Sequence, residues 1–234
     1  MAIRAITFDC AKTVVAVDYD PVRFAVQCLA HTSIVPPPNA AATYGPLFLS
    51  HYATFLEANL RNDPEAGRQV YLSINRQWLA AMGLDPGRAE EIFLAGEQLA
   101  FGEDAEFFTA YPDAAPALGE LKELGFRLAM VSNWDYTLPR VIEMLALEEY
   151  FEFVLASLVV GVEKPDPLLF QAALDRFGLP PDEVLHVGDL ELDDRDGAIA
   201  AGMPWTLIDR DREPEFPKRI RSLSQVKEAL SWPR

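Results

Sequence analysis

Three aspartates follow short apolar runs in this chain, at places where their carboxylates could take part in chemistry. Asp9 follows the run Ile3–Phe8. Asp189 follows the run Val184–Gly188, and Asp194 comes five residues later. Carboxylates are the hard oxygen ligands that Mg²⁺ prefers, and an aspartate held against a divalent cation can attack a phosphoryl group and carry it covalently. The competing interpretation of such an aspartate is a helix cap or a turn former.

Polar and cationic residues that could bind a phosphoryl group occur elsewhere in the chain. Ser132 and Asn133 follow the apolar run 128–131, and the serine hydroxyl with nearby backbone N–H groups could bind a phosphoryl oxygen. Lys164 lies in the segment 162–170, which reads Val-Glu-Lys-Pro-Asp-Pro-Leu-Leu-Phe. Taken singly, a Ser-Asn pair is more often a turn or a helix cap, and a lone lysine is usually a solvated surface charge.

The first half of the chain predicts one strand followed by a helical module. Residues 1–16 have the pattern of a strand, whereas from about residue 18 to residue 104 apolar residues recur at helical spacing. Aspartate–proline pairs are typical of helix starts, because aspartate caps the helix and proline suits its first position. These pairs are Asp20-Pro21, Asp63-Pro64 and Asp85-Pro86. We expect about four helices in this module.

After Tyr111-Pro112 the pattern alternates between helix and strand. The predicted strands cover 127–131, 153–157, 184–187 and 205–208, and the predicted helices cover 114–124, 138–147, 167–177, a short stretch to Ala201 and 222–230. Gly125 and Gly178 are predicted to end two of these helices, because glycine suits the residue after a helix. Pro214 to Pro217 are predicted to form a loop. Strands that alternate with helices imply an α/β fold with a doubly wound parallel sheet, whose sites gather at the carboxyl ends of the strands.

Composition limits the classes of partner. The net charge of −16 over 234 residues argues against nucleic acid as a partner, because binding its backbone needs clustered lysines and arginines. No apolar run approaches the roughly 20 residues of a membrane span, and the N-terminal run is too short for a signal peptide. Cys10 and Cys28 give no disulfide framework, so we expect a reducing cytoplasm. A small phosphorylated substrate stays compatible with this charge.

In their order along the chain, Asp9, Ser132, Lys164, Asp189 and Asp194 resemble the motifs of the haloacid dehalogenase-like (HAD) hydrolases. The resemblance covers the whole chain. It implies a Rossmann-like core formed by residues 1–16 and 105–234, with an inserted α-helical cap domain over 17–104.

The resemblance also implies a role for each residue of the motifs. Asp9 would be the nucleophile, assisted by Lys164. Thr13, Ser132, Asn133 and Lys164 would bind the phosphorylated substrate. Mg²⁺ would be the cofactor, held by Asp9, the backbone carbonyl of Ala11, Asp189 and Asp194. His186 and Cys10 are interpreted as structural side chains.

One position departs from the pattern of the resembled phosphatases. Their first motif is Asp-x-Asp-x-Thr, and its second aspartate is the general acid and base, whereas this chain has Ala11 there and Lys12 in place of the usual glycine. General acid–base help of this kind accelerates a reaction by about 10²–10⁴-fold. The resemblance therefore implies a Mg²⁺-dependent phosphatase of low or specialised activity, which prefers good leaving groups.

Alternatives follow from the same departure. A dehalogenase of 2-haloacids needs no second aspartate, because halide leaves without a proton, although the pair Asp189 and Asp194 favours a metal site. A HAD-fold binding or regulatory protein is the other alternative. Phosphonate-cleaving members also have alanine here, but they use a cap lysine, and residues 18–104 contain none. Neither the substrate's identity nor the oligomeric state follows from the sequence.

Overall fold

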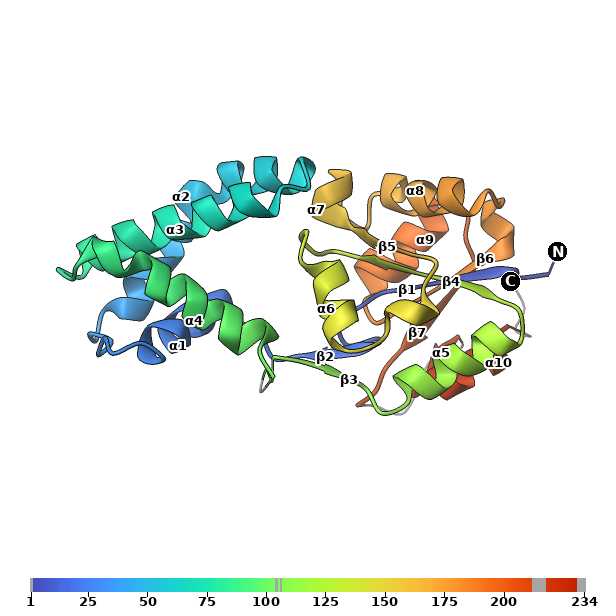
Figure 1. Ribbon diagram of the computed structural model, residues 1–234. Coiled ribbons are helices and arrows are strands. Elements are labelled where there is room, and N and C mark those ends of the chain that lie inside the picture. Colours follow the sequence, from blue (N-terminus) through green and yellow to red (C-terminus); the bar gives the residue numbers. More distant parts are fainter. Residues whose placement is uncertain (1, 104, 106, 212–217, 231–234) are drawn as a thin grey trace. The chain divides into compact units, whose positions relative to one another are not determined.

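The computed structural model describes residues 2–103, 105, 107–211 and 218–230. The contacts divide the chain into two compact units. We call Met1–Val17 together with Thr109–Arg234 the α/β unit, and Asp18–Phe108 the helical unit. The main sheet belongs to the α/β unit, and helices α1 to α4 belong to the helical unit (Figure 1). The predicted loop from Pro214 to Pro217 lies outside the described residues.

The α/β unit contains a parallel sheet, which confirms the predicted fold class. Among the described residues its strand order is β5-β4-β1-β6-β7-β8, and every pairing is parallel. The strands are β1 (Ala5–Phe8), β4 (Arg127–Ser132), β5 (Phe153–Ala156), β6 (Val184–Gly188), β7 (Trp205–Ile208) and β8 (Arg219–Ile220). All four residues of β1 are buried, as expected for a central strand that is covered on both faces.

The register of the sheet brings three strand ends together. Phe8 of β1 is level with Met130 of β4 on one side and with Val187 of β6 on the other. The chain therefore leaves β1, β4 and β6 at the same edge of the sheet. This edge is the carboxyl one, where α/β sheets place their sites.

Helices cover both faces of this sheet, with α8 and α9 on one side and α5 and α10 on the other (Figure 1). The helices are α5 (Ala114–Glu123), α6 (Leu138–Met144), α7 (Ser157–Val160), α8 (Pro167–Phe177), α9 (Gly197–Ala200) and α10 (Val226–Ala229). Helix α8 packs Phe170 and Phe177 into a core with Ala5 and Ala129 of the sheet. Its predicted end at Gly178 is confirmed, since that glycine has a φ of 63°.

Some short elements differ from the prediction. The helix expected over 222–230 is a 3₁₀ turn, Leu223–Gln225, followed by the four residues of α10. Strand β8 and helix α7 were not predicted, because two to four residues are too few to establish a period. Two three-residue strands, β2 (Val15–Val17) and β3 (Phe108–Ala110), pair with each other and were missed as separate strands for the same reason.

The helical unit consists of α1 (Pro21–Ala30), α2 (Ala40–Leu60), α3 (Pro64–Ala81) and α4 (Ala89–Phe101), with a 3₁₀ turn, Pro86–Arg88, before α4. The predicted starts are confirmed: the carboxylates of Asp20, Asp63 and Asp85 accept hydrogen bonds from backbone N–H groups of the first turn. Trp78 is fully buried and donates its indole N–H to the Ala40 carbonyl. Within the described ranges, no helix combines the length and the apolar character needed to cross a membrane.

Candidate active site

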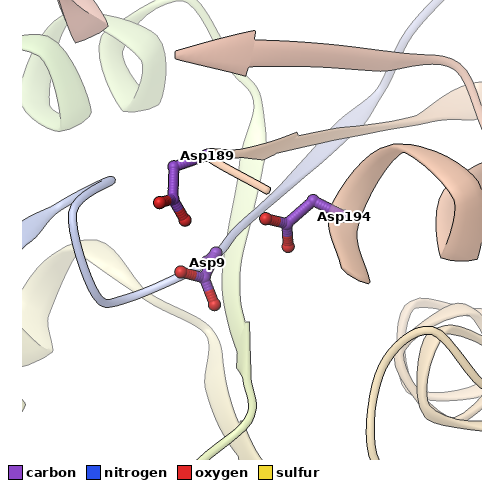
Figure 2. A group of neighbouring side chains, drawn as sticks. All are labelled: Asp9, Asp189 and Asp194. Carbon is purple, nitrogen blue, oxygen red and sulfur yellow. The ribbon is translucent and has the colours of Figure 1, made fainter. Parts of the chain in front are cut away.

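The three predicted aspartates lie together at the carboxyl edge of the sheet (Figure 2). Asp9 directly follows β1, and its backbone N–H donates to the Val187 carbonyl at 2.8 Å. Asp189 directly follows β6, and Asp194 lies on a π-helical turn, Glu191–Asp196. One carboxylate oxygen from each aspartate lies within 4.8 Å of the other two. Residues 185 positions apart in sequence thus form one acidic cluster.

Lys164 joins two of these carboxylates. Its Nζ donates to Asp9 Oδ1 at 2.5 Å and to Asp194 Oδ1 at 2.6 Å, and its side chain is only 2% exposed. Burial alone would lower the pKa of Lys164, but the two carboxylates raise it above its usual range. Burial alone would raise the pKa of Asp194, but Lys164 and His186 hold it below its usual range. Lys164 is therefore a buried ammonium shared by two carboxylates.

Among the described residues, no ammonium group is paired with Asp189, and the electrostatics of its carboxyl group differ. Burial, followed by the charges of Asp9 and Asp194, raises the pKa of Asp189 to about 7. The three carboxyl groups together carry more negative charge than the Lys164 ammonium offsets, although Lys12 and Lys164 both act to lower the pKa of Asp189. A divalent cation with oxygen ligands fits this set of donors and this charge. The residues present thus fit a divalent cation, and Ala11 follows Asp9 by two residues.

The last residue of β4, Ser132, and the residue after it, Asn133, bind other site residues. Ser132 is buried, and its hydroxyl donates to Asp9 Oδ1 at 2.9 Å. The Asn133 side chain donates to the Lys164 carbonyl at 3.0 Å and accepts from the Lys164 N–H at 2.7 Å. The amide of Asn133 thus fixes the backbone from which Lys164 reaches the carboxylates.

His186 joins the cluster, although from the sequence it was interpreted as a structural side chain. It lies within β6, is fully buried, and its Nε2 is 3.0 Å from Asp194 Oδ1. Burial lowers the pKa of His186, which keeps the ring neutral. Because a carboxylate only accepts, Nε2 carries the hydrogen, and Nδ1 accepts from the Thr7 hydroxyl at 2.9 Å. His186 thereby orients Asp194.

Gly188 gives Asp194 room to reach the cluster. A Cβ atom on Gly188 would lie 2.1 Å from Asp194 Cγ, so this position excludes every other residue unless Asp194 moves. The second oxygen of Asp194, Oδ2, accepts from the Leu190 N–H at 2.9 Å. The sequence Gly188-Asp189-Leu190 thus forms a backbone cradle around Asp194.

The loop after Asp9 contains the residues that depart from the pattern. Lys12 is exposed and has a φ of 58°, in the left-handed region that favours glycine. Thr13 is fully buried, and its hydroxyl has no hydrogen-bond partner among the described residues. Cys10 is also buried, and burial together with the charge of Asp9 raises the pKa of its thiol. Cys10 is therefore a neutral, packed side chain at neutral pH.

Comparison with known proteins places the chain in a family. A family model for haloacid dehalogenase-like hydrolases matches residues 3–202. Because this match covers most of the chain, the protein belongs to the haloacid dehalogenase-like hydrolases.

Three proteins of similar sequence are two phosphatases and a hydrolase domain-containing protein. The phosphoserine phosphatase of Thermus thermophilus is 36% identical over 159 residues, which are 64% of this chain and 61% of that protein. The glyceraldehyde 3-phosphate phosphatase of Methanopyrus kandleri is 33% identical over 149 residues, 60% of each chain. The haloacid dehalogenase-like hydrolase domain-containing protein 3 of Xenopus laevis is 28% identical over 223 residues, 94% of this chain and 88% of that protein. The matches thus span about six tenths of the two phosphatases.

Solved structures share the fold. The 2-haloacid dehalogenase of Pseudomonas syringae pv. Tomato DC3000 has a TM-score of 0.67 at 24% identity, with 98% of both chains covered. The HAD phosphatase of Thermococcus onnurineus has a TM-score of 0.60 at 22% identity, with the same coverage. These two proteins share a fold but are named for different reactions, dehalogenation and phosphate hydrolysis. The fold alone therefore does not assign a reaction to this chain, and the assignment must come from the residues of the site.

Proposed function

We propose that this hydrolase is a Mg²⁺-dependent phosphatase that acts on a small phosphorylated metabolite through an aspartyl-phosphate at Asp9. The observation that carries the proposal is the cluster of Asp9, Asp189 and Asp194, with oxygens within 4.8 Å of one another and Lys164 between two of them. The similarity to two phosphatases supports it. The metal when bound would offset the charge of the phosphoryl group and of the cluster.

The hydrogen bonds of Asp9 indicate which of its oxygens attacks. Oδ1 accepts from Lys164 Nζ at 2.5 Å and from the Ser132 hydroxyl at 2.9 Å. Oδ2 has no hydrogen-bond partner among the described residues, so it is the oxygen that is free to attack phosphorus. Lys164 and Ser132 fix the carboxylate during the attack, and the Lys164 ammonium offsets developing charge.

Further residues would hold the metal and the substrate. The metal ligands would be Asp9, the Ala11 carbonyl and Asp189, while Asp194 would bind the metal or orient its waters. Backbone N–H groups at the sheet edge would bind phosphoryl oxygens, with Asn133 fixing the backbone of Lys164. The Ser132 hydroxyl has a single hydrogen, so it would bind a phosphoryl oxygen only by turning away from Asp9. A substrate-binding role for Thr13 would require its buried hydroxyl to become accessible.

Ala11 sets the specificity of the reaction. Its methyl group cannot protonate the leaving oxygen or activate the water that cleaves the aspartyl-phosphate. Acyl and aryl phosphates need little protonation, so they should react faster than alkyl phosphates. Their aspartyl-phosphate should then break down slowly, because the base is missing as well.

Dehalogenation of 2-haloacids is the second candidate, and Ala11 is the observation that favours it. Halide leaves without a proton, so the missing carboxylate would cost that reaction nothing. The metal-suited cluster distinguishes the two, because a dehalogenase of this family needs no metal. A binding or regulatory role without turnover is the third candidate.

A paired screen tests the proposal. Phosphorylated small molecules and 2-chloroacids are incubated with the wild type and with Asp9→Asn, in Mg²⁺ or in chelator. We expect phosphate release that needs both Mg²⁺ and Asp9. Chloride release that is indifferent to chelator would replace the proposal with dehalogenation, and no turnover of either class would favour the binding role.

Three broader features of the chain complete the proposal. The helical unit, residues 18–108, would be the cap that selects the substrate. The described cysteines, Cys10 and Cys28, are both free and buried, in keeping with a reducing cytoplasm. The net charge of −16 disfavours nucleic acid as a partner.

A further inference from the structure

Arg210 reaches the loop that follows Asp9 from the opposite end of the chain. It lies two residues beyond β7, and its side chain is 14% exposed. Its Nη2 donates to the Thr13 carbonyl at 2.6 Å, and its Nε donates to the Lys12 carbonyl at 3.3 Å. One guanidinium thus binds two consecutive carbonyls of this loop.

Two further contacts fix the guanidinium itself. It stacks on the Tyr111 ring, 3.6 Å from the centroid, and its Nη1 donates to Asp113 Oδ2 at 3.1 Å. Asp113 also accepts from the Ser222 hydroxyl at 2.6 Å and from the Leu223 N–H at 2.9 Å. All three nitrogens of Arg210 thus donate to protein oxygens, two of them to carbonyls of this loop and one to Asp113.

The segment that Arg210 binds, Lys12 and Thr13, includes an unfavourable backbone conformation. The left-handed region is unfavourable for residues other than glycine, and Lys12 has a φ of 58° there. The Lys12 N–H donates to the Val15 carbonyl at 2.7 Å, which closes the turn from within. Arg210 holds the same turn from outside, through the carbonyls of Lys12 and Thr13, which belong to two consecutive peptide groups.

We propose that Arg210 is a positioning residue: by holding the Lys12 and Thr13 carbonyls it fixes the turn that presents the Ala11 carbonyl beside Asp9. The proposal rests on the proposed function, since it concerns the metal and the reaction at Asp9. A planar fork with several donors suits this task, because it holds two acceptors in a fixed relation. Where a glycine would adopt the turn unaided, this chain with Lys12 uses a distant arginine.

The test compares Arg210→Ala with Arg127→Ala. Arg127 is a matched control, since it stacks on Phe177 at 4.9 Å, donates to the Phe177 carbonyl at 2.7 Å and pairs with Glu152. It lies at the amino end of β4, whereas the site is at the carboxyl end. Both variants lose a ring contact, an ion pair and hydrogen bonds to backbone carbonyls, two in Arg210→Ala and one in Arg127→Ala, so Arg127→Ala controls for the loss of a packed, paired arginine away from the site.

Mg²⁺ affinity by calorimetry and kcat with KM for an aryl phosphate are the measurements. We expect Arg210→Ala to lose about 10–100-fold in Mg²⁺ affinity or kcat, the range typical of residues that orient metal ligands. KM at saturating Mg²⁺ should change little, since Arg210 does not touch the substrate. Added guanidinium ion should restore part of the loss, and Arg210→Lys should be intermediate. Arg127→Ala should keep both Mg²⁺ affinity and kcat.

The outcomes separate this inference from the proposed function. Equal Mg²⁺ affinity and kcat in the two alanine variants would overturn the positioning role while leaving the phosphatase intact. Weaker Mg²⁺ binding only in Arg210→Ala, in a protein that hydrolyses no phosphate ester, would support the role and overturn the phosphatase. A wild type that neither binds Mg²⁺ nor turns over would overturn both. If Arg210→Ala fails to fold, Arg210→Lys decides by the same measurements.

Discussion

Replacing Lys164 by methionine tests the electrostatics of the buried cluster. The change keeps the length and the apolar stem of the side chain but removes the ammonium between Asp9 and Asp194. The two carboxylates are 8% and 1% exposed in their side chains, so water cannot replace the lost partner. Removing one partner of a buried ion pair costs about 3–5 kcal/mol. Since two carboxylates lose the same counter-ion, we expect the upper part of that range, about 4–5 kcal/mol, in chelator at pH 7.

The loss should depend on pH. In the wild type the pKa of Asp194 is held below its unfolded value, so its contribution to stability is present at neutral pH and is lost as the pH falls through the folded pKa. In Lys164→Met the buried carboxylates would have raised pKa values, so protonation relieves their repulsion as the pH falls. The difference in unfolding free energy between the two proteins should therefore shrink from pH 7 towards about pH 4.

Urea unfolding in chelator measures these differences, and Lys227→Met is the control. Lys227 pairs with Glu120 at 2.7 Å, but the two side chains are 48% and 45% exposed. Such surface pairs contribute about 0–1 kcal/mol. A loss below about 1 kcal/mol for Lys164→Met at pH 7, or a loss that does not change with pH, would refute the description of the cluster as buried and paired.

Three further predictions follow from the site. Ala11→Asp, alone and combined with Lys12→Gly, should raise hydrolysis of an alkyl phosphate by at least ~10-fold and of an aryl phosphate less, as steady-state kinetics would show; no gain for either, with Mg²⁺ binding kept, would favour the binding role. Thr13→Val should raise the unfolding free energy by about 1 kcal/mol, because it removes a buried hydroxyl without a partner among the described residues; a loss of turnover with folding kept would instead indicate that the hydroxyl binds substrate. Without metal, the pKa of about 7 for Asp189 in the folded protein lies above the usual carboxyl value of about 3.9. The unfolding free energy should therefore fall as the pH rises between these two values, and Asp189→Asn or saturating Mg²⁺ should remove that pH dependence. A metal-free stability that is flat over this range would contradict the third.

The sequence predicted most of the α/β architecture because its local signals agree. Apolar runs gave the central strands, and glycines after helices gave their ends, as at Gly125 and Gly178 with φ values of 89° and 63°. The alternation of elements then placed Asp9 and Asp189 at one edge of the sheet. Three-residue strands such as β2 carry no such period, which is why they were missed.

The contacts within the site were harder to predict, since they depend on long-range geometry. The contact between His186 and Asp194 depends on the π-helical turn that folds Asp194 back over Gly188. The eight-residue spacing between His186 and Asp194 does not predict that turn. The hydrogen bond from Arg210 to the Thr13 carbonyl joins residues 197 positions apart. Nothing in an isolated arginine near a strand end distinguishes it from a solvated charge.

Chemical trapping of the acyl-phosphate tests the central claim, attack by Asp9 on phosphorus, most directly. The protein is mixed with an aryl phosphate and Mg²⁺, quenched, and treated with borohydride, which reduces an aspartyl-phosphate to homoserine. Because Ala11 cannot activate the hydrolytic water, the intermediate should accumulate behind a burst of phenol stoichiometric with protein. Peptide mass spectrometry should then find homoserine at position 9, dependent on both Mg²⁺ and substrate and absent from Asp9→Asn. Release of phenol with no modification at position 9, or with modification at another residue, would contradict the claim.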